Sequence, residues 1–163
     1  MILNNYWKYL KVMMESGVTE NTNLQTSMKK IGGNLAYYNP NYASNNTQIT
    51  QSGGVRLGTG TNTYTADDYE LAEDITSSIS SLNFTYASAV ENDKLRRIIT
   101  ITGTNSTNDN IVVTEAAFTK GMQYVSGGYI RTDEVMCNIA RLETPVTVPP
   151  ANSFVIVLEW DEM

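Results

Sequence analysis

The sequence predicts an all-β fold built as an antiparallel β-sandwich, with a short N-terminal helix and a long polar arm before it. Strand-like runs follow one another with short turns between them, at residues 82–88, 95–102, 111–115, 135–142 and 154–160. In the last run every second residue is bulky and apolar, from Phe154 to Trp160, because successive side chains of a strand point to opposite faces. Short strands at this spacing are typical of a jelly-roll or an immunoglobulin-like sandwich.

Residues 2–16 predict the N-terminal helix. Apolar side chains recur every three or four residues from Leu3 through Trp7 to Met14, and Gly17 supplies a C-terminal stop. An isolated helix of this length is marginal in water, so its apolar stripe must dock. The docking surface is either its own domain or a neighbouring molecule.

Residues 18–54 are rich in Thr, Asn, Gln and Ser and have too few apolar side chains to pack independently. A loop of this length is either functional or tied to a partner. We therefore divide the chain into a helix and polar arm, residues 1–52, and a β-sandwich domain, residues 53–163. Aromatic side chains dominate protein interfaces, so the candidate contact anchors are Trp7, Tyr37, Tyr38 and Tyr42. One or two of the tyrosines could instead anchor the arm to the core.

Residues 55–60 predict a strand that enters a tight turn. Thr65 and Asp68 resemble a capping box, which predicts a short helix through Glu73. Residues 103–110 are polar and predict a turn that hydrogen-bonds its own backbone. Prolines bracket residues 146–148, and because proline lacks an amide donor this piece is expected at a sheet edge or a bend.

Charge and cysteine content exclude several classes of partner. The net charge of −6 argues against nucleic acid, which needs a basic surface. No apolar stretch is long enough to cross a membrane, and the first residues do not resemble a signal peptide. The single cysteine, Cys137, cannot form an internal disulfide and alternates with Val135 and Ile139, so we expect it to face the core.

Catalytic chemistry is sparse. The chain has no histidine, which removes the commonest general base and transition-metal ligand, and one cysteine cannot build a zinc site. The Leu57–Gly60 turn lacks the lysine of a phosphate loop. Carboxylate neighbours could in principle hydrolyse a glycosidic bond or hold calcium; these are Asp67 with Asp68, Glu70 with Glu73, Asp133 with Glu134, and, for calcium, also Asp109. Each has a simpler reading as a helix start or polar turn, so we expect no catalytic residues, no metal and no cofactor.

Two arginines lie inside apolar runs. Arg56 and Arg141 either face solvent or form an ion pair with a carboxylate such as Glu115 or Glu143. Arginine also favours contacts between subunits because of its rigid planar fork. We keep Arg56, Arg141 and Glu115 as candidate ion-pair residues.

Three segments in a fixed order carry a family resemblance. Residues 55–71 contain a glycine-rich turn before a Thr-Ala-x-Asp-Tyr-x-Leu pattern, residues 111–118 resemble a following strand, and residues 140–154 resemble a closing Pro-Val-x-Val segment. This order resembles small virion structural proteins of tailed bacteriophages and prophages. Ala117 and Asn152 stand where that pattern usually has glycine.

The resemblance implies a non-enzymatic β-sandwich subunit of a phage particle, assembled in the host cytoplasm. It implies a role as a tail, neck or fibre adaptor or as a capsid decoration protein. The expected partners are other virion proteins and further copies of the chain, for example in a trimer, with no nucleic acid and no membrane. The alternative is a carbohydrate-binding module that recognises a host surface, with a stacking platform made by Tyr64, Tyr69, Tyr124 and Tyr129.

Overall fold

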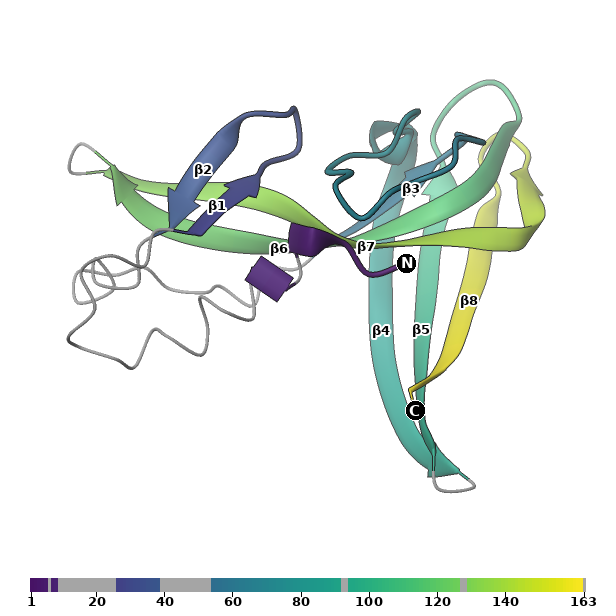
Figure 1. The fold of residues 1–163 in the computed structure, drawn as a ribbon. Coiled ribbons are helices and arrows are strands. Elements are labelled where there is room, and N and C mark those ends of the chain that lie inside the picture. Colours follow the sequence, from purple (N-terminus) through teal and green to yellow (C-terminus); the bar gives the residue numbers. More distant parts are fainter. Residues whose placement is uncertain (6, 9–25, 39–53, 92–93, 127–128, 163) are drawn as a thin grey trace. The chain divides into compact units, whose positions relative to one another are not determined.

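The computed structural model describes the chain except for residues 6, 9–25, 39–53, 92–93, 127–128 and 163. The fold is all-β, with antiparallel strand pairs. Its elements are β1 (Thr26–Lys29), β2 (Leu35–Tyr38), β3 (Val55–Gly58), the 3-10 helix η2 (Thr76–Ser78), β4 (Ile79–Glu91), β5 (Lys94–Asn105), β6 (Ile111–Ser126), β7 (Tyr129–Val148) and β8 (Ser153–Glu162). These strands form a two-stranded sheet, β1-β2, and two three-stranded sheets, in the orders β3-β6-β7 and β4-β5-β8 (Figure 1).

The strands predicted in the second half of the chain are confirmed, and so is the short strand after Gly54. Most of these strands are longer than the ranges predicted from the alternation of apolar residues. β7 continues through Pro145, and β7 is an edge strand of the sheet β3-β6-β7. The proline, which has no amide donor, therefore lies on an edge strand, as expected. The turn predicted at residues 103–110 is confirmed for residues 106–110, which connect β5 to β6, whereas residues 103–105 belong to β5.

The helix predicted from Thr65 to Glu73 is wrong, because this segment forms only turns. The capping contact does form: the Asp68 carboxylate accepts from the Thr65 amide, and the Asp68 amide donates to the Thr65 carbonyl at 3.2 Å. The helix does not continue because the backbone pairs with other segments. The Glu73 carbonyl accepts from Thr59 at 3.0 Å, which satisfies a group that a helix would have used.

The N-terminal residues add a short extended segment beside β7. Ile2 forms an antiparallel bridge with Asn138, and the Leu3 amide donates to the Cys137 carbonyl at 3.0 Å. The helix predicted from residue 2 therefore does not include Ile2 and Leu3. Residues 4, 5, 7 and 8 have helical backbone, but most of the segment to residue 16 lies outside the described residues. The N-terminal helix stays a prediction.

The polar arm contains a hairpin that the sequence analysis missed. β1 and β2 pair from Thr26 with Tyr38 to Lys29 with Leu35, so the expectation of a loop is wrong for residues 26–38. The turn uses Gly32 and Gly33, whose φ values of +92° and +84° favour glycine. The remaining arm residues, 18–25 and 39–53, lie outside the described part of the chain.

The chain divides into two compact units, and β6 and β7 contribute residues to both. Unit one comprises residues 1–54, 62–71 and 117–139; unit two comprises residues 55–61, 72–116 and 140–163. The predicted division into residues 1–52 and 53–163 stays a prediction, since much of the first part lies outside the described residues. In unit one a buried cluster is formed by Leu3, Leu71, Ala117, Met136 and Ile139, with Tyr64 packed against it. In unit two the buried apolar side chains include Val55, Leu57, Ile79, Ile99, Ile101, Val113, Ala116, Val148, Phe154 and Ile156.

Asn105 at the end of β5 is a buried polar side chain that ties three segments of unit two together. Its Nδ2 atom donates to the carbonyls of Asp109 at 2.8 Å and Val148 at 2.9 Å. Its Oδ1 atom accepts from the Thr107 amide at 2.9 Å, and its backbone amide donates to the Asn152 carbonyl at 3.0 Å. One side chain thereby closes the β5–β6 turn and holds it to the end of β7.

We expect Asn105→Ala to lower the free energy of unfolding by about 2 to 4 kcal/mol, because the buried Val148 carbonyl loses its donor and the turn loses its closure. Urea unfolding followed by circular dichroism measures the change. Asn108→Ala, in the exposed part of the same turn, is the matched control and should change stability by about 0.5 kcal/mol or less. Equal effects of the two substitutions would contradict the role of Asn105.

Cys137 faces the core of unit one, as the sequence predicted. It is buried, and its Sγ lies 3.8 Å from the Val135 carbonyl oxygen. Burial raises the pKa of the Cys137 thiol to about 12, although the charge of Lys120 acts in the opposite direction. At neutral pH the group is therefore a buried, protonated thiol.

We expect the native protein to react with a disulfide reagent such as DTNB far more slowly than the protein unfolded in guanidinium chloride. The physical reason is that attack needs an accessible thiolate. Absorbance of the released thiolate gives both rates. Thr63→Cys, which adds an exposed thiol in unit one, is the positive control. Rapid modification of the native wild-type protein would show that Cys137 is not shielded.

Candidate assembly surface

The sheet β4-β5-β8 has two faces defined by the register of its strands. Tyr86 pairs with Ile99, which pairs with Leu158, and two residues further along Phe84 pairs with Ile101, which pairs with Ile156. Because paired residues of neighbouring strands point to the same side, these rows form one face, here called the inner face. The rows between them, which include Thr100 and Thr102, form the outer face.

The inner face is buried at one end. Ile101 is fully buried, and Ile99 and Ile156 are nearly so. Gly103 lies in this region because there is no room for a side chain: a Cβ atom would come within 2.5 Å of Ile79 and 2.8 Å of Phe154. The core of unit two therefore covers this end of the sheet.

The same face becomes exposed toward the other end. Tyr86 is 49% exposed and Val90 is 78% exposed. The β4 and β5 strands continue together from this region to the pair Glu91 and Lys94. The sheet thus extends beyond the side chains that cover its inner face.

The outer face is exposed and apolar at the end that carries Val155 and Val157, and the register places charged residues toward its other end. Val155 and Val157 of β8 are 64% and 51% exposed, and Thr85 and Ala87 of β4 are exposed as well. Arg96 and Glu159 form an ion pair toward one end of this face. Apolar and threonine side chains on an open sheet surface suit contact with another protein better than contact with water.

The two edges of this sheet differ in charge. β4 has no charged residue from Ile79 to Val90, whereas β8 ends with Glu159, Asp161 and Glu162. Charged side chains on an edge strand discourage pairing with another chain, and β4 lacks that protection. The charge-free run of β4 is visible in the sequence and is the signal that could have indicated this surface.

The predicted contact anchors belong to unit one. Trp7 is exposed, and Tyr37 and Tyr38 lie in β2. Tyr42 lies outside the described residues. The candidate surface on β4-β5-β8 was not among the predicted sites, because the sequence analysis sought exposed aromatics in the polar arm.

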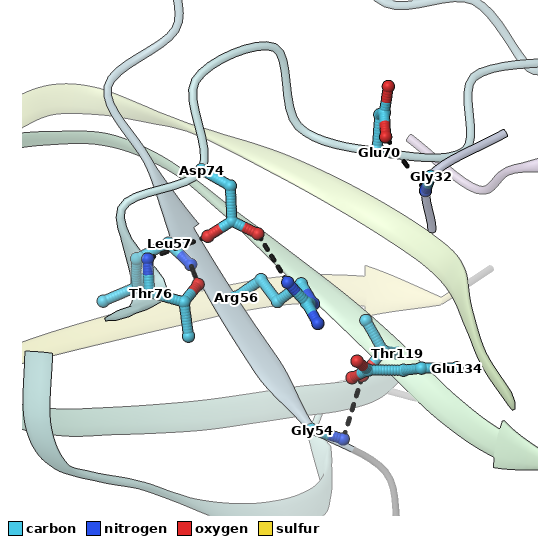
Figure 2. Close-up of polar contacts among 9 residues, drawn as sticks. All are labelled: Gly32, Gly54, Arg56, Leu57, Glu70, Asp74, Thr76, Thr119 and Glu134. Atoms are coloured by element: carbon cyan, nitrogen blue, oxygen red, sulfur yellow. Dashed lines mark hydrogen bonds and ion pairs between the residues drawn. The ribbon is translucent and has the colours of Figure 1, made fainter. Parts of the chain in front are cut away.

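Arg56 forms an ion pair with Asp74, a residue that the sequence analysis did not consider. Figure 2 shows its Nη1 atom directed at Asp74 Oδ2, 2.7 Å away. The other carboxylate oxygen of Asp74 accepts from the Thr76 amide at 2.8 Å, at the start of η2. Partial burial would raise the pKa of Asp74, but hydrogen bonds from Thr76 and Arg56 and the arginine charge together hold the pKa below its usual value.

Glu115 is fully buried, and the glycines of the Leu57–Gly60 turn lie against it. A Cβ atom at Gly58 would come 2.4 Å from Glu115 Oε1, and one at Gly60 would come 2.7 Å from the same oxygen. The Thr114 hydroxyl donates to the Gly60 carbonyl at 2.7 Å. The Glu115 side chain fills the space beside these glycines, so a phosphate has no room there.

Arg141 is exposed in β7, and its pairing with Glu115 or Glu143 stays a prediction. A second group of polar contacts in Figure 2 lies in unit one. The Gly54 amide donates to the Thr119 hydroxyl at 3.1 Å, and that hydroxyl donates to Glu134. These contacts hold the chain beside β6.

Among the described residues, no group of three or more His, Cys, Asp and Glu side chains is placed to hold a metal ion. Within the same residues, no helix has the length and apolarity needed to span a membrane. No family model, curated protein or solved structure matches this chain. The surface itself therefore carries the functional argument.

We expect Asp74→Asn to lower stability at neutral pH by about 0.5 to 1.5 kcal/mol, because the amide keeps the contact to the Thr76 backbone but loses the charge that pairs with Arg56. Since the folded-state pKa of Asp74 is lowered, this contribution is present above pH 4 or so and is lost as the pH falls through the folded-state pKa.

The difference between wild type and variant should therefore shrink in acid. Urea midpoints measured from neutral pH down to about pH 2 test this. Asp109→Asn, in an exposed turn, removes the same charge and is the control. A difference between wild type and Asp74→Asn that stays constant over the whole pH range would contradict the ionic contribution.

Proposed function

We propose that this protein is a non-enzymatic structural subunit of a bacteriophage particle, and that it acts by assembling with other subunits. The order of the three sequence segments that resemble tailed-phage virion proteins supplies the class of particle. Within it, the role is that of a tail, neck or fibre adaptor or of a capsid decoration protein. We also propose that the antiparallel sheets pack as a β-sandwich.

The observation that carries the proposal is the exposed apolar surface of β4-β5-β8. Tyr86 and Val90 on the inner face and Val155 and Val157 on the outer face are each about half exposed or more. Two exposed apolar side chains thus lie on each face of this sheet, and exposed apolar surface on a sheet favours contact with another protein. Such an interface takes roughly 800 Å² from each partner, which one three-stranded sheet with its flanking turns can supply.

The alternative, a carbohydrate-binding module, receives less support. Tyr64 packs against the buried cluster of unit one, and the Tyr69 hydroxyl lies 3.1 Å from where a Cβ at Gly33 would stand. Both rings therefore have a packing role within the protein. A glycan array remains the direct test: binding that Tyr69→Ala abolishes would favour the module.

We expect the protein to co-purify with phage particles from an induced host strain through a density gradient, as detected by mass spectrometry. The double substitution Val155→Asp with Val157→Asp should reduce its incorporation by about tenfold or more, because charges replace apolar contact area. Circular dichroism must first show that the variant is folded.

The matched control is Asn108→Asp with Asn110→Asp, which adds the same negative charge at an exposed turn of unit two. It should leave incorporation unchanged. Particles that lack the wild-type protein would overturn the proposed function.

A further inference from the structure

The outer edge of β4 is a long pairing surface. β4 lies at one end of the order β4-β5-β8, and its residues from Asn83 to Glu91 pair with β5 without interruption. The only irregularity of its pairing with β5 is a bulge between Ser80 and Asn83, where Ser81 has a φ of 51°. Natural edge strands are usually protected by charge, proline or a bulge, and the stretch beyond Asn83 has none of these before Glu91.

We propose that β4 pairs antiparallel with β4 of a second copy of this chain, so that two β4-β5-β8 sheets become one continuous sheet. This inference rests on the proposed assembly function and names its first partner. A two-fold axis through such a pair makes the interface self-complementary, as in most homodimers.

Charge decides between the two edges of the sheet. β8 carries Glu159, Asp161 and Glu162 in its C-terminal half, and charged residues on an edge strand discourage pairing with another chain. β4 has a single charged residue, Glu91, at its end. The β4 edge is therefore the less protected of the two, and the second copy pairs there.

Ala87 is the middle residue of the regular part of β4, residues 83–91. A two-fold axis at Ala87 therefore pairs this whole part with the same part of the second copy. It places Thr85 opposite Ala89 of the second copy on the outer face, and Phe84 opposite Val90 of the second copy on the inner face. Asn83 then pairs with Glu91 of the second copy. The exposed Val90 gains an aromatic neighbour, which is a favourable cross-strand pair.

The size of the contact is adequate for a specific dimer. Nine residues in antiparallel register exchange roughly eight to ten backbone hydrogen bonds. A typical protein interface has about ten. The apolar side chains of the inner face would add contact area along the same line.

The test uses two double variants that differ only at residue 85. Thr85→Glu with Ala89→Glu places carboxylates opposite each other across the axis, whereas Thr85→Lys with Ala89→Glu places opposite charges there. Both keep Glu at position 89 beside its β5 neighbour Arg96, and residue 85 has the neutral neighbour Thr100. In both variants, residues 85 and 89 therefore have the same neighbours on β5 of their own chain.

Sedimentation equilibrium of the full chain should show a dimer for wild type and for the Lys/Glu variant. The Glu/Glu variant should dissociate with a dissociation constant raised by about tenfold or more relative to the Lys/Glu variant. Equal dimerisation of the two variants would overturn the pairing through β4, and so would a wild-type monomer at its highest soluble concentration.

Cross-linking gives an independent readout. Ala87→Cys should form a disulfide-linked or bismaleimide-linked dimer much faster than Val155→Cys, which is also exposed but lies on β8. The buried thiol of Cys137 adds no background. Cross-linking of Ala87→Cys no faster than that of Val155→Cys would also overturn the proposal.

The outcome is separable from that of the proposed function. A monomeric protein that still co-purifies with particles overturns the β4 pairing and leaves the role in the particle intact. A β4-dependent dimer that is absent from particles supports the pairing and overturns the proposed function.

Discussion

The alternation of side chains along β5 is the constraint on which unit two depends. As the central strand of its sheet, β5 pairs with β4 on one side and β8 on the other, so its register assigns a face to every residue of both neighbours. Burial of Ile99 and Ile101 fixes that register, because a slip of one residue would send both side chains to the outer face. The same burial leaves Val155 and Val157 exposed on the opposite side.

Polar contacts then stabilise the ends of the strands. Asn105 joins the β5–β6 turn to the last residue of β7, and Asp74 joins η2 to β3 through Thr76 and Arg56. Such contacts contribute less than apolar burial, but they determine where each strand stops. With its strand ends held in this way, the sheet offers a defined edge and a defined outer face to a partner.

Strands in the second half of the chain were predictable from the sequence because their apolar side chains alternate. Phe154 and Ile156 are buried and Val155 and Val157 are exposed, as the alternation indicates. The β1-β2 hairpin was not predicted, because β1 is mostly polar and β2 is a four-residue apolar run without alternation. Burial of Met28 on β1 stabilises the hairpin, and the local signals are Gly32, Gly33 and the apolar run of β2. The segment from Thr65 to Glu73 misled the prediction for the opposite reason: a correct capping contact forms, but backbone pairing with distant segments replaces the helix.

For the candidate surface, the sequence by itself determined which residues could take part. It set the charge-free run of β4, the acidic end of β8, the lack of histidine and the inward orientation of Cys137. Only the tertiary structure decided that β4 and β8 lie at opposite edges of one sheet, that Asp74 is a partner of Arg56, and that Leu3 extends beside β7. The physical reason is that periodicity and charge are local properties of the chain, whereas edge position and ion pairing depend on contacts between residues far apart in sequence.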